Sequence, residues 1–403
     1  MNILVLNCGS SSVKYKLIDV DRKVTLAEGG VEKIGLPGSF IKFKLPDGEK
    51  KTVEEPIPDH RKAINDILNT LTDAHYGCIK SFKEIDAVGH RVVHGGEKFN
   101  KSVKIDDEVI AKIKECYDVA PLHNPVNMAG IEAITELMPG VPQVAVFDTA
   151  FHQTMPKEAY MYALPYDLYE KYGIRRYGFH GTSHRYVARR VCDFLGVPYE
   201  KQRIITCHIG NGGSITAVKD GKSVDTSMGL TPVEGLMMGT RVGDIDPGAL
   251  TFVMDKEHLS TKELSDLINK KSGVLGISGI SSDMRDIEAA IARGDEKAKL
   301  ALDMYVYRII KYIGAFAAVL DGVDIIVFTG GVGENQQPLR KSVCDHLGYL
   351  GVKIDQEVNA VSRGEEKVIS SADSKVKVVV IPTDEELMIA RDTEAIVNGR
   401  QPE

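Results

Sequence analysis

The chain has 403 residues, of which 43% are hydrophobic and 27% are charged, and its formal net charge is −7. This length favours two or three domains, and the composition excludes disordered and fibrous proteins. The negative charge and the lack of a basic cluster argue against a nucleic-acid partner.

No apolar stretch approaches the ~18 residues that a membrane helix needs. Residues 1–7 have neither the basic leader nor the apolar length of a signal peptide. The six cysteines form no CxxC pair, which is typical of reduced, mostly buried thiols. We therefore expect a cytoplasmic protein that does not associate with membranes.

Short β-branched runs alternate with helical patterns along the chain. In chain order, strands are predicted at residues 3–7, 87–90, 143–148, 204–208, 324–329 and 375–382. Helices are predicted at residues 61–73, 106–116, 128–137, 183–195, 261–271, 296–320 and 385–397. This alternation predicts an α/β protein whose sheets are flanked by helices, with ligands at the carboxyl ends of the strands.

The sequence also contains an internal similarity. Residues 3–12 (ILVLNCGSSS) predict a strand and a small-residue turn, and an alternating run to Asp19 follows. Residues 204–214 (IITCHIGNGGS) repeat this plan, with an alternating run to Asp220. Two unrelated hairpins are the simpler interpretation. The repeated polar tips favour two related halves.

Gly-rich turns follow three of the predicted strands, at residues 7–12, 210–214 and 330–335. Small residues allow backbone N–H groups to converge on an anion, so three such turns indicate a bound nucleotide. Two better-known nucleotide motifs are absent from the sequence. A P-loop ending at Ser223 would need glycine at Thr216, and a dinucleotide motif starting at Gly331 would need glycine at Gln336.

Arg91, Arg241 and Asp148 are candidate site residues because each stands at a strand end or among glycines. An arginine in such a position can clamp an anion closely. A structural ion pair is an equally good interpretation for each of them. The pairs His90/His94 and His180/His184 have i, i+4 spacing, but without a third ligand in view a zinc site is disfavoured. Phosphate donors or satisfied core histidines are the preferred interpretations.

Two helix starts carry specific predictions. The loop at residues 178–184 should lead into a helix capped by Thr182 or Ser183. Thr383 and Glu386 have the spacing of a capping box for the last helix. That assignment leaves two further acids, Asp384 and Glu385. One of them could face Mg²⁺, and a favourable helix-dipole charge explains them equally well.

Seven segments together resemble the motifs of the acetokinase family, in the sugar kinase–Hsp70–actin superfamily. They are residues 6–14 (LNCGSSSVK), 89–96 (GHRVVHGG), 147–152 (FDTAFH), 176–184 (RYGFHGTSH), 208–212 (HIGNG), 239–244 (GTRVGD) and 381–387 (IPTDEEL). The resemblance covers essentially the whole chain. It implies two related actin-like, ribonuclease-H-like domains with mixed sheets and an active site in the interdomain cleft. The implied domains are residues 1–150 with 386–403, and residues 151–385.

The resemblance implies Mg²⁺-dependent, reversible phosphoryl transfer from ATP to acetate in a homodimer, with Mn²⁺ able to replace Mg²⁺. Asp148 would be the catalytic carboxylate, His180 and Arg241 would stabilise the transition state, and Arg91 would face the carboxylate or the phosphoryl group. Asn7 and Glu385 would help to hold the metal ion. A small pocket for the acyl methyl group would consist of Val93, Leu122, Phe179 and Pro232. The nucleotide would be lined by Ser10, Ser12, Lys14, His208, Ile209, Gly210, Asn211, Gly212, Asp283, Met284, Arg285, Gly331, Val332, Gly333, Glu334 and Asn335.

One position departs from the family pattern, because Gln336 stands where serine usually follows Glu-Asn. The adenine contacts are therefore open. Propionate kinase is the close alternative, since one methylene is worth only ~1–3 kcal/mol, and Val93 favours acetate. A butyrate kinase fits the opening motif less well. The alternative from a different class is a nucleotide-switched protein of the actin or Hsp70 type that is not a kinase.

Overall fold

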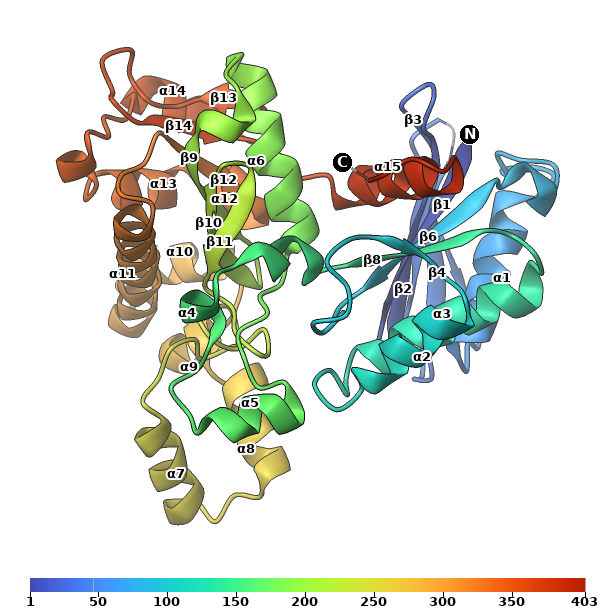
Figure 1. Cartoon of the computed structure of the whole chain (residues 1–403), viewed down its shortest axis with the longest axis horizontal. Coiled ribbons are helices and arrows are strands. Elements are labelled where there is room, and N and C mark those ends of the chain that lie inside the picture. The colour runs from blue at the N-terminus through green and yellow to red at the C-terminus, as the bar shows by residue number, and fades with distance from the viewer. Residues whose placement is uncertain (46, 403) are drawn as a thin grey trace. The chain divides into compact units, whose positions relative to one another are not determined.

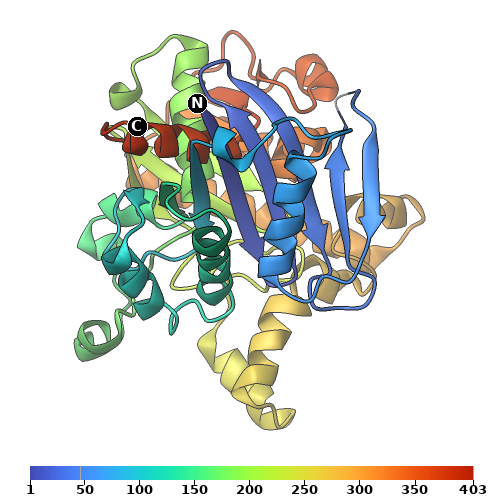
Figure 2. The same cartoon turned by 90° about the vertical axis from the view of Figure 1, so that its right-hand side faces the viewer.

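The computed structural model describes residues 1–45 and 47–402 (Figures 1 and 2). The chain divides into two compact units, Met1–Gln153 with Asp384–Glu403 and Thr154–Thr383. The boundaries that the family resemblance implies lie after residues 150 and 385. Glu385 therefore belongs to the first unit and not to the second.

The first unit contains an eight-stranded sheet with the order β5-β4-β3-β2-β1-β6-β8-β7. Strands β1 to β5 form antiparallel neighbours, whereas β1, β6 and β8 run parallel. The strands are β1 (Asn2–Gly9), β2 (Ser12–Asp19), β3 (Val24–Glu32), β4 (Phe40–Lys44), β5 (Lys50–Glu54), β6 (Ala87–Val92), β7 (Val103–Lys104) and β8 (Gln143–Phe147). The α-helices are α1 (His60–Leu71), α2 (Asp107–Glu115), α3 (Asn124–Leu137) and α15 (Glu385–Val397), with short 3₁₀ turns at Phe82–Glu84 and Ala150–Thr154.

Alternating apolar residues on β1 explain why helices cover both faces of this sheet. Leu4 and Leu6 pack in one cluster with residues of α1 and α3. Ile3 and Val5 point to the other face and pack with Ile389 of α15. The C-terminal helix therefore completes the core of the N-terminal unit (Figure 1).

The second unit contains a six-stranded sheet with the order β11-β10-β9-β12-β14-β13. Its strands are β9 (Arg203–Ile209), β10 (Gly213–Lys219), β11 (Lys222–Thr226), β12 (Ile325–Thr329), β13 (Lys367–Val368) and β14 (Lys377–Val380). Its α-helices are α4 (Lys157–Tyr160), α5 (Tyr166–Tyr172), α6 (Gly181–Leu195), α7 (Pro247–Lys256), α8 (Thr261–Lys270), α9 (Gly273–Ser278), α10 (Met284–Ala292), α11 (Glu296–Val319), α12 (Gly330–Asn335), α13 (Gln337–Cys344) and α14 (Gln356–Val361). Short 3₁₀ turns lie at Tyr199–Lys201 and Gly348–Leu350.

The two faces of β9 again receive different helices. Ile205 and Cys207 point into the main core cluster, which contains the apolar side of α11. Thr206 and His208 point to the opposite face, where their side chains bond residues of α6. Figure 1 shows α6 and α11 on opposite sides of this sheet.

The two sheets share one plan. In each, an antiparallel hairpin (β1–β2 or β9–β10) is joined to a third strand on one side and to two parallel strands on the other. The predicted duplication and the predicted α/β class with helix-flanked mixed sheets are confirmed. The predicted strands correspond to β1, β6, β8, β9, β12 and β14, and the predicted helices correspond to α1, α2, α3, α6, α8, α11 and α15.

Both predictions about helix starts are wrong. Helix α6 begins at Gly181, and the capping position is His180, in the left-handed region at φ 53°. Helix α15 is capped by Asp384, whose carboxylate accepts from the Leu387 N–H at 3.0 Å. The Thr383 hydroxyl is instead engaged by Ser183 at 2.7 Å. At α15 a neighbouring side chain with better reach replaces the predicted cap, whereas no side chain caps α6, and Ser183 bonds His208 and Thr383 instead.

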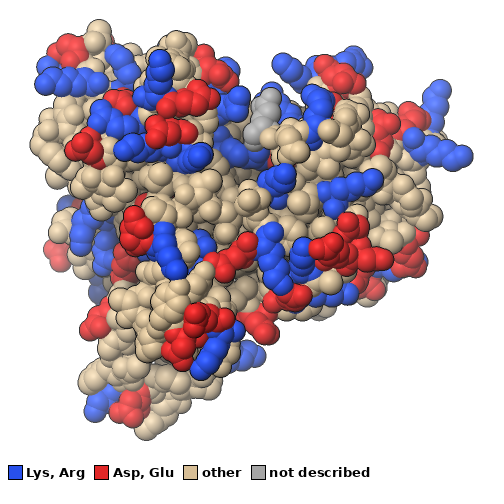
Figure 3. Space-filling model, viewed as in Figure 1, with Lys and Arg blue, Asp and Glu red and all other residues tan. Residues whose placement is uncertain are grey.

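The surface and the thiols are ordinary. On the face drawn in Figure 3, the described lysines and arginines are interspersed with aspartates and glutamates. No helix in the described part of the chain is long and apolar enough to cross a membrane. All six cysteines are free, and Cys78 is the exposed one.

Candidate active site

The first unit gathers three predicted site residues at one edge of its sheet. Asn7 lies near the end of β1, Arg91 near the end of β6, and Asp148 directly follows β8. Because these strands are parallel neighbours, their carboxyl ends meet. The Arg91 guanidinium donates from Nε and Nη2 to both carboxylate oxygens of Asp148, at 2.9 and 2.6 Å, and from Nη1 to Asn7 Oδ1 at 3.3 Å.

This ion pair is buried on its acidic side, because Asp148 is 1% exposed. The Asp148 carboxylate raises the pKa of Arg91 further above its usual range. A buried charge requires such pairing. Glu385, at the start of α15, behaves differently: burial raises its pKa to about 7, while Arg91 opposes that rise and Asp148 adds to it. The nearby Arg91 guanidinium therefore does not offset the effect of burial on Glu385.

Two buried asparagines of α3 hold the loop that follows Arg91. Asn127 Oδ1 accepts from the Val93 N–H at 3.0 Å, and its Nδ2 donates to the Cys8 carbonyl at 2.9 Å. Asn124 bonds both the N–H and the carbonyl of His94, at 3.1 and 2.8 Å. Asn127 thus joins the ends of β1 and β6 next to Asn7 and Arg91. Sequence reasoning missed both residues, although two asparagines three apart at a helix start were a signal.

The donors of this cluster suit a hard cation. Asn7, Asp148 and Glu385 each carry an oxygen that can bind a metal ion, and a divalent cation would favour the ionised form of Glu385, whose pKa is raised mainly by burial. Mg²⁺ commonly takes one or two carboxylates and keeps water and substrate oxygens as its other ligands. No group of three or more His, Cys, Asp or Glu within the described residues forms a metal cage. The residues present fit a metal ion that takes some of its ligands from the protein and the others from a substrate and water.

His90 is a structural histidine. Its Nε2 bonds Gln143 Oε1 at 2.7 Å, and burial lowers its pKa to about 4. His94 Nδ1 accepts from the Gly96 N–H at 3.0 Å. The contact with Gln143 agrees with the interpretation of His90 as a satisfied core histidine.

In the second unit, the side chains of His180 and Arg241 both lie close to Gly212. A Cβ on Gly212 would lie 3.2 Å from Arg241 Nη1 and 3.7 Å from the His180 ring. The His180 ring stacks on His208, with centroids 4.2 Å apart. His180 also has the uncommon left-handed backbone noted above, which is frequent at functional positions. An anion beside Gly212 would meet both donors.

Hydroxyl groups orient these histidines. Ser214 Oγ lies 2.9 Å from His180 Nδ1 and 2.7 Å from His184 Nε2, and His184 Nδ1 lies 2.7 Å from Thr206 Oγ1. Since Ser214 has one proton to share, the proton positions on the two histidines are coupled. His184 is therefore a buried support of His180, which explains their i, i+4 spacing.

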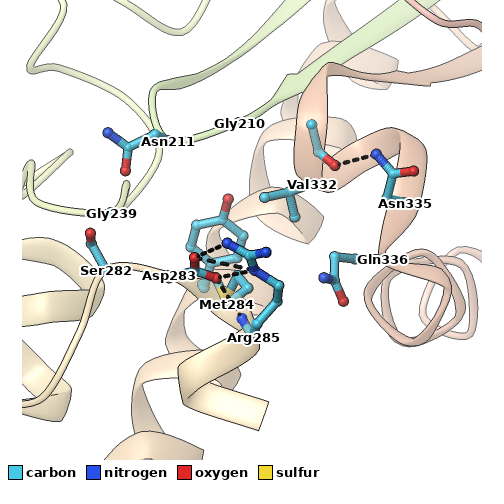
Figure 4. Close-up of a pocket in the computed structure, with 12 residues that line it drawn as sticks. Gly210, Asn211, Gly239, Ser282, Asp283, Met284, Arg285, Val332, Asn335 and Gln336 are labelled. Carbon is cyan, nitrogen blue, oxygen red and sulfur yellow. Dashed lines mark hydrogen bonds and ion pairs between the residues drawn. The ribbon is translucent and has the colours of Figure 1, made fainter. Parts of the chain in front are cut away.

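The second unit also contains a cavity of about 660 Å³, with Gly210 and Asn211 in its lining (Figure 4). Its lining includes the predicted residues Gly210, Asn211, Asp283, Met284, Arg285, Gly331, Val332 and Asn335. The lining also includes Gly239, Ser282, Tyr305 and Gln336, which were not predicted as nucleotide residues. The predicted residues His208, Ile209, Gly212, Gly333 and Glu334 do not line it. Tyr305 could not be found from sequence because it lies within the long apolar helix α11.

Figure 4 shows Arg285 turned onto Asp283, with Asn335 and Gln336 on the other side of the cavity. Asp283 caps α10 through the Arg285 N–H and pairs with the Arg285 guanidinium at 2.6 Å. This pairing lowers the pKa of Asp283 to about 2. The two charges offset each other, so the cavity is polar without a dominant charge.

The remaining predicted residues are divided between the units. Ser10, Ser12 and Lys14 belong to the β1–β2 hairpin of the first unit, where Lys14 lines a hollow of about 420 Å³ that also contains Lys16, Lys42, Lys44 and Lys50. Val93 is buried and Leu122 is 64% exposed in the first unit. Phe179 is buried and Pro232 is half-buried in the second. The methyl pocket stays a prediction.

Two sheets of one plan, one ending in an arginine–carboxylate cluster and the other in a glycine-walled cavity, define an actin-like two-domain phosphotransferase. The acetokinase family model matches residues 2–391, and the chain belongs to that family. It is 65% identical over 400 residues to an acetate kinase of Parabacteroides distasonis, which covers 99% of this chain and 100% of the relative.

Solved structures agree with this assignment. The crystal structure of Porphyromonas gingivalis acetate kinase has a TM-score of 0.95 and 61% identity, covering 98% of this chain and 99% of the other. That of a propionate kinase from Francisella tularensis has a TM-score of 0.91 and 44% identity, with the same coverage of 98% and 99%.

Proposed function

We infer that the protein is an acetate kinase, which reversibly transfers the terminal phosphoryl group of ATP to acetate and yields acetyl phosphate and ADP. The observation that carries this function is the Arg91–Asp148 pair with Asn7 at three adjoining strand ends. It occurs in a chain 65% identical, over nearly its full length, to a protein named acetate kinase.

The chemistry needs charge neutralisation more than a base. A carboxylate with a pKa near 4 is ionised at neutral pH and can attack directly. The difficulty is to bring one anion to another in line. Arg91 would bind the carboxylate or the phosphoryl group, and His180 and Arg241 would stabilise the charge that spreads over the equatorial oxygens.

Asp148 orients another residue and does not serve as a proton acceptor. Both of its oxygens accept from Arg91, so the carboxylate fixes the plane of the guanidinium. We propose that Asp148 orients Arg91 and contributes to the negative charge that attracts a metal ion. This assignment refines the catalytic carboxylate that the family resemblance implies.

Membership of the family implies ATP as a substrate and a divalent metal ion. We propose Mg²⁺, which Mn²⁺ can replace, held with the help of Asn7 and Glu385. When bound, the ion neutralises phosphate charge. We propose that ATP binds the second-unit cavity through the residues that line it. Ser10, Ser12, Lys14 and the other predicted nucleotide residues stay predictions.

We further propose a cytoplasmic homodimer whose partners are small molecules, without a nucleic acid or a membrane. The free cysteines support a reducing compartment. The propionate kinase alternative is less favoured, because the propionate kinase structure is 44% identical whereas the acetate kinase of P. distasonis is 65% identical. Family membership also disfavours a nucleotide switch without transfer chemistry.

The test is to measure initial rates with MgATP and acetate, propionate or butyrate, with hydroxylamine to trap the acyl phosphate. We expect acetate to give the highest kcat/KM. A higher value for propionate would retain the mechanism and change the substrate. Folded protein that binds ATP and forms no acyl hydroxamate from any of the three acids would contradict the proposed function.

A further inference from the structure

Glu334 makes its side-chain hydrogen bonds within the protein, through a single oxygen. Its Oε1 accepts from the Gly330 N–H at 2.9 Å, from the Thr383 N–H at 3.0 Å and from the Thr329 hydroxyl at 3.2 Å. Glu334 does not line the nucleotide cavity, although its neighbours Val332 and Asn335 do. The carboxylate therefore joins the end of β12, the start of α12 and the segment that follows β14.

The first of these partners, Gly330, directly precedes a residue of the cavity wall. Gly330 has φ 80°, and a Cβ there would lie 2.7 Å from the Ile209 carbonyl, so only glycine fits. The next residue, Gly331, lines the cavity. The far end of α12 is held by the fully buried Arg340, which donates to the carbonyls of Gly333 and Glu334 at 3.0 and 2.9 Å. The wall is thus fixed at both ends.

The second partner, Thr383, is the last residue of the second unit. Its hydroxyl bonds Ser183 at 2.7 Å, and Ser183 bonds His208 Nδ1 at 2.7 Å. The following residues are Asp384, which caps α15, and Glu385 of the carboxylate cluster. Thr383 is therefore held from two directions where the chain enters α15.

We propose that Glu334 is a positioning residue, and not a nucleotide ligand, which fixes the cavity wall and the entry into α15 through one shared oxygen. The expected effect of Glu334 on turnover rests on the proposed function. All three bonds end on Oε1, so the reach of that oxygen matters more than the charge. Glutamine keeps an acceptor oxygen at the position of Oε1. Aspartate keeps the charge, but its shorter side chain withdraws the acceptor oxygen by the length of one methylene.

The experiment compares Glu334→Gln with Glu334→Asp. Amide hydrogen exchange, followed by mass spectrometry in the ligand-free protein, reports on peptides containing Gly330 and Thr383. Because Glu334→Asp withdraws the acceptor that the Gly330 and Thr383 N–H groups share, both peptides should exchange at least ~10-fold faster in this variant. Misplacement of a site by about 1 Å costs about 10²-fold, so kcat should fall at least ~30-fold. Glu334→Gln should stay within ~5-fold of wild type in both measurements.

The matched controls are Glu365→Gln and Glu365→Asp, at an exposed position, and neither should change exchange or kcat. Equal loss in both Glu334 variants, a milder loss for Glu334→Asp, or wild-type behaviour of both would overturn the proposal.

If Glu334→Asp does not fold, Glu334→Gln decides alone: a kcat within tenfold of wild type supports the proposal, and a larger loss overturns it. Wild-type protein that forms no acyl hydroxamate would instead refute the proposed function, and the exchange measurement would still test Glu334.

Discussion

The two units show how one sheet plan supports two kinds of binding chemistry. In the first unit, parallel strands end in side chains, and Arg91, Asp148 and Asn7 meet at the sheet edge. In the second, β9 and β12 lead into glycine turns, and Gly210 and Gly331 of these turns form part of the wall of the cavity with their backbone. The topology determines where strand ends gather, and the residues at those ends determine what they bind.

The two regions also balance charge differently. The first holds the buried Asp148 carboxylate and the half-buried Glu385 near one guanidinium, and desolvation raises the pKa of Glu385 to about 7. The second pairs Asp283 with Arg285 and supports its histidines through hydroxyl groups. The first region is therefore suited to the metal and the small anion, and the second is suited to the larger, partly apolar nucleotide.

The largest expected effect is on turnover. A charge-stabilising arginine can contribute 10³–10⁵ in kcat, so Arg91→Ala and Arg241→Ala should each lower kcat at least ~100-fold. Arg91→Ala should also lower stability, because it leaves the Asp148 carboxylate buried without its partner. Steady-state rates and circular dichroism check both variants. A loss below tenfold in folded protein would count against these roles.

The next effect tests the backbone-built wall of the second unit. Arg340 is fully buried, burial lowers its pKa to about 10, and its guanidinium donates to carbonyls of Gly333, Glu334, Asn359 and Ser362. Arg340→Met leaves these acceptors unsatisfied and should lower the free energy of unfolding by about 3 kcal/mol. The control Arg363→Met, at an exposed position, should change it by less than ~0.5 kcal/mol. Equal denaturation midpoints for both variants would show that the wall does not depend on Arg340.

A smaller effect concerns the Glu385 carboxyl of the first unit. Glu385 binds its proton more tightly in the folded state, so its contribution to stability falls as pH rises from its ordinary pKa through about 7. His90, with its pKa lowered to about 4, acts in the opposite direction below its own ordinary pKa. The difference between wild type and Glu385→Gln isolates Glu385.

Without added metal, wild type should lose about 2 kcal/mol relative to Glu385→Gln between pH 5 and pH 8. Denaturant titrations of both proteins across this range measure the difference. Parallel stability curves would mean that the carboxyl is not perturbed.

The smallest expected effect lies at Gly212. Its Cβ would crowd Arg241 Nη1 at 3.2 Å, which a flexible side chain can accommodate by moving. Gly212→Ala should therefore lower kcat about tenfold by displacing Arg241, with little change in stability. Gly348→Ala is the matched control, because nothing lies within 4 Å of its Cβ. Equal activity of the two variants would contradict the close approach at Gly212.

Sequence alone predicted the parts that depend on local pattern. The strands that carry Asn7, Arg91 and Asp148 follow from β-branched runs with polar ends, and the duplication follows from the two hairpins. The details that failed depend on partners distant in sequence. Thr383 does not cap α15, because its hydroxyl meets Ser183, 200 residues away, while Asp384 reaches the Leu387 N–H.

Other residues were missed for the same reason. Arg340 resembles an ordinary surface charge on an amphipathic helix, and only the packed structure shows it buried against backbone carbonyls. Asn127 gains its role from the Cys8 carbonyl, 119 residues earlier. Glu334 belongs to a motif that suggests nucleotide contact, but its oxygen is used within the protein.

The most direct test of this division between the units measures Arg91→Ala twice, for ADP affinity by calorimetry and for acetyl hydroxamate formation. We expect the ADP dissociation constant to stay within ~3-fold of wild type, while hydroxamate formation falls at least ~100-fold. ADP affinity that falls in proportion to the rate, or hydroxamate formation that persists, would contradict the separate roles of the two units.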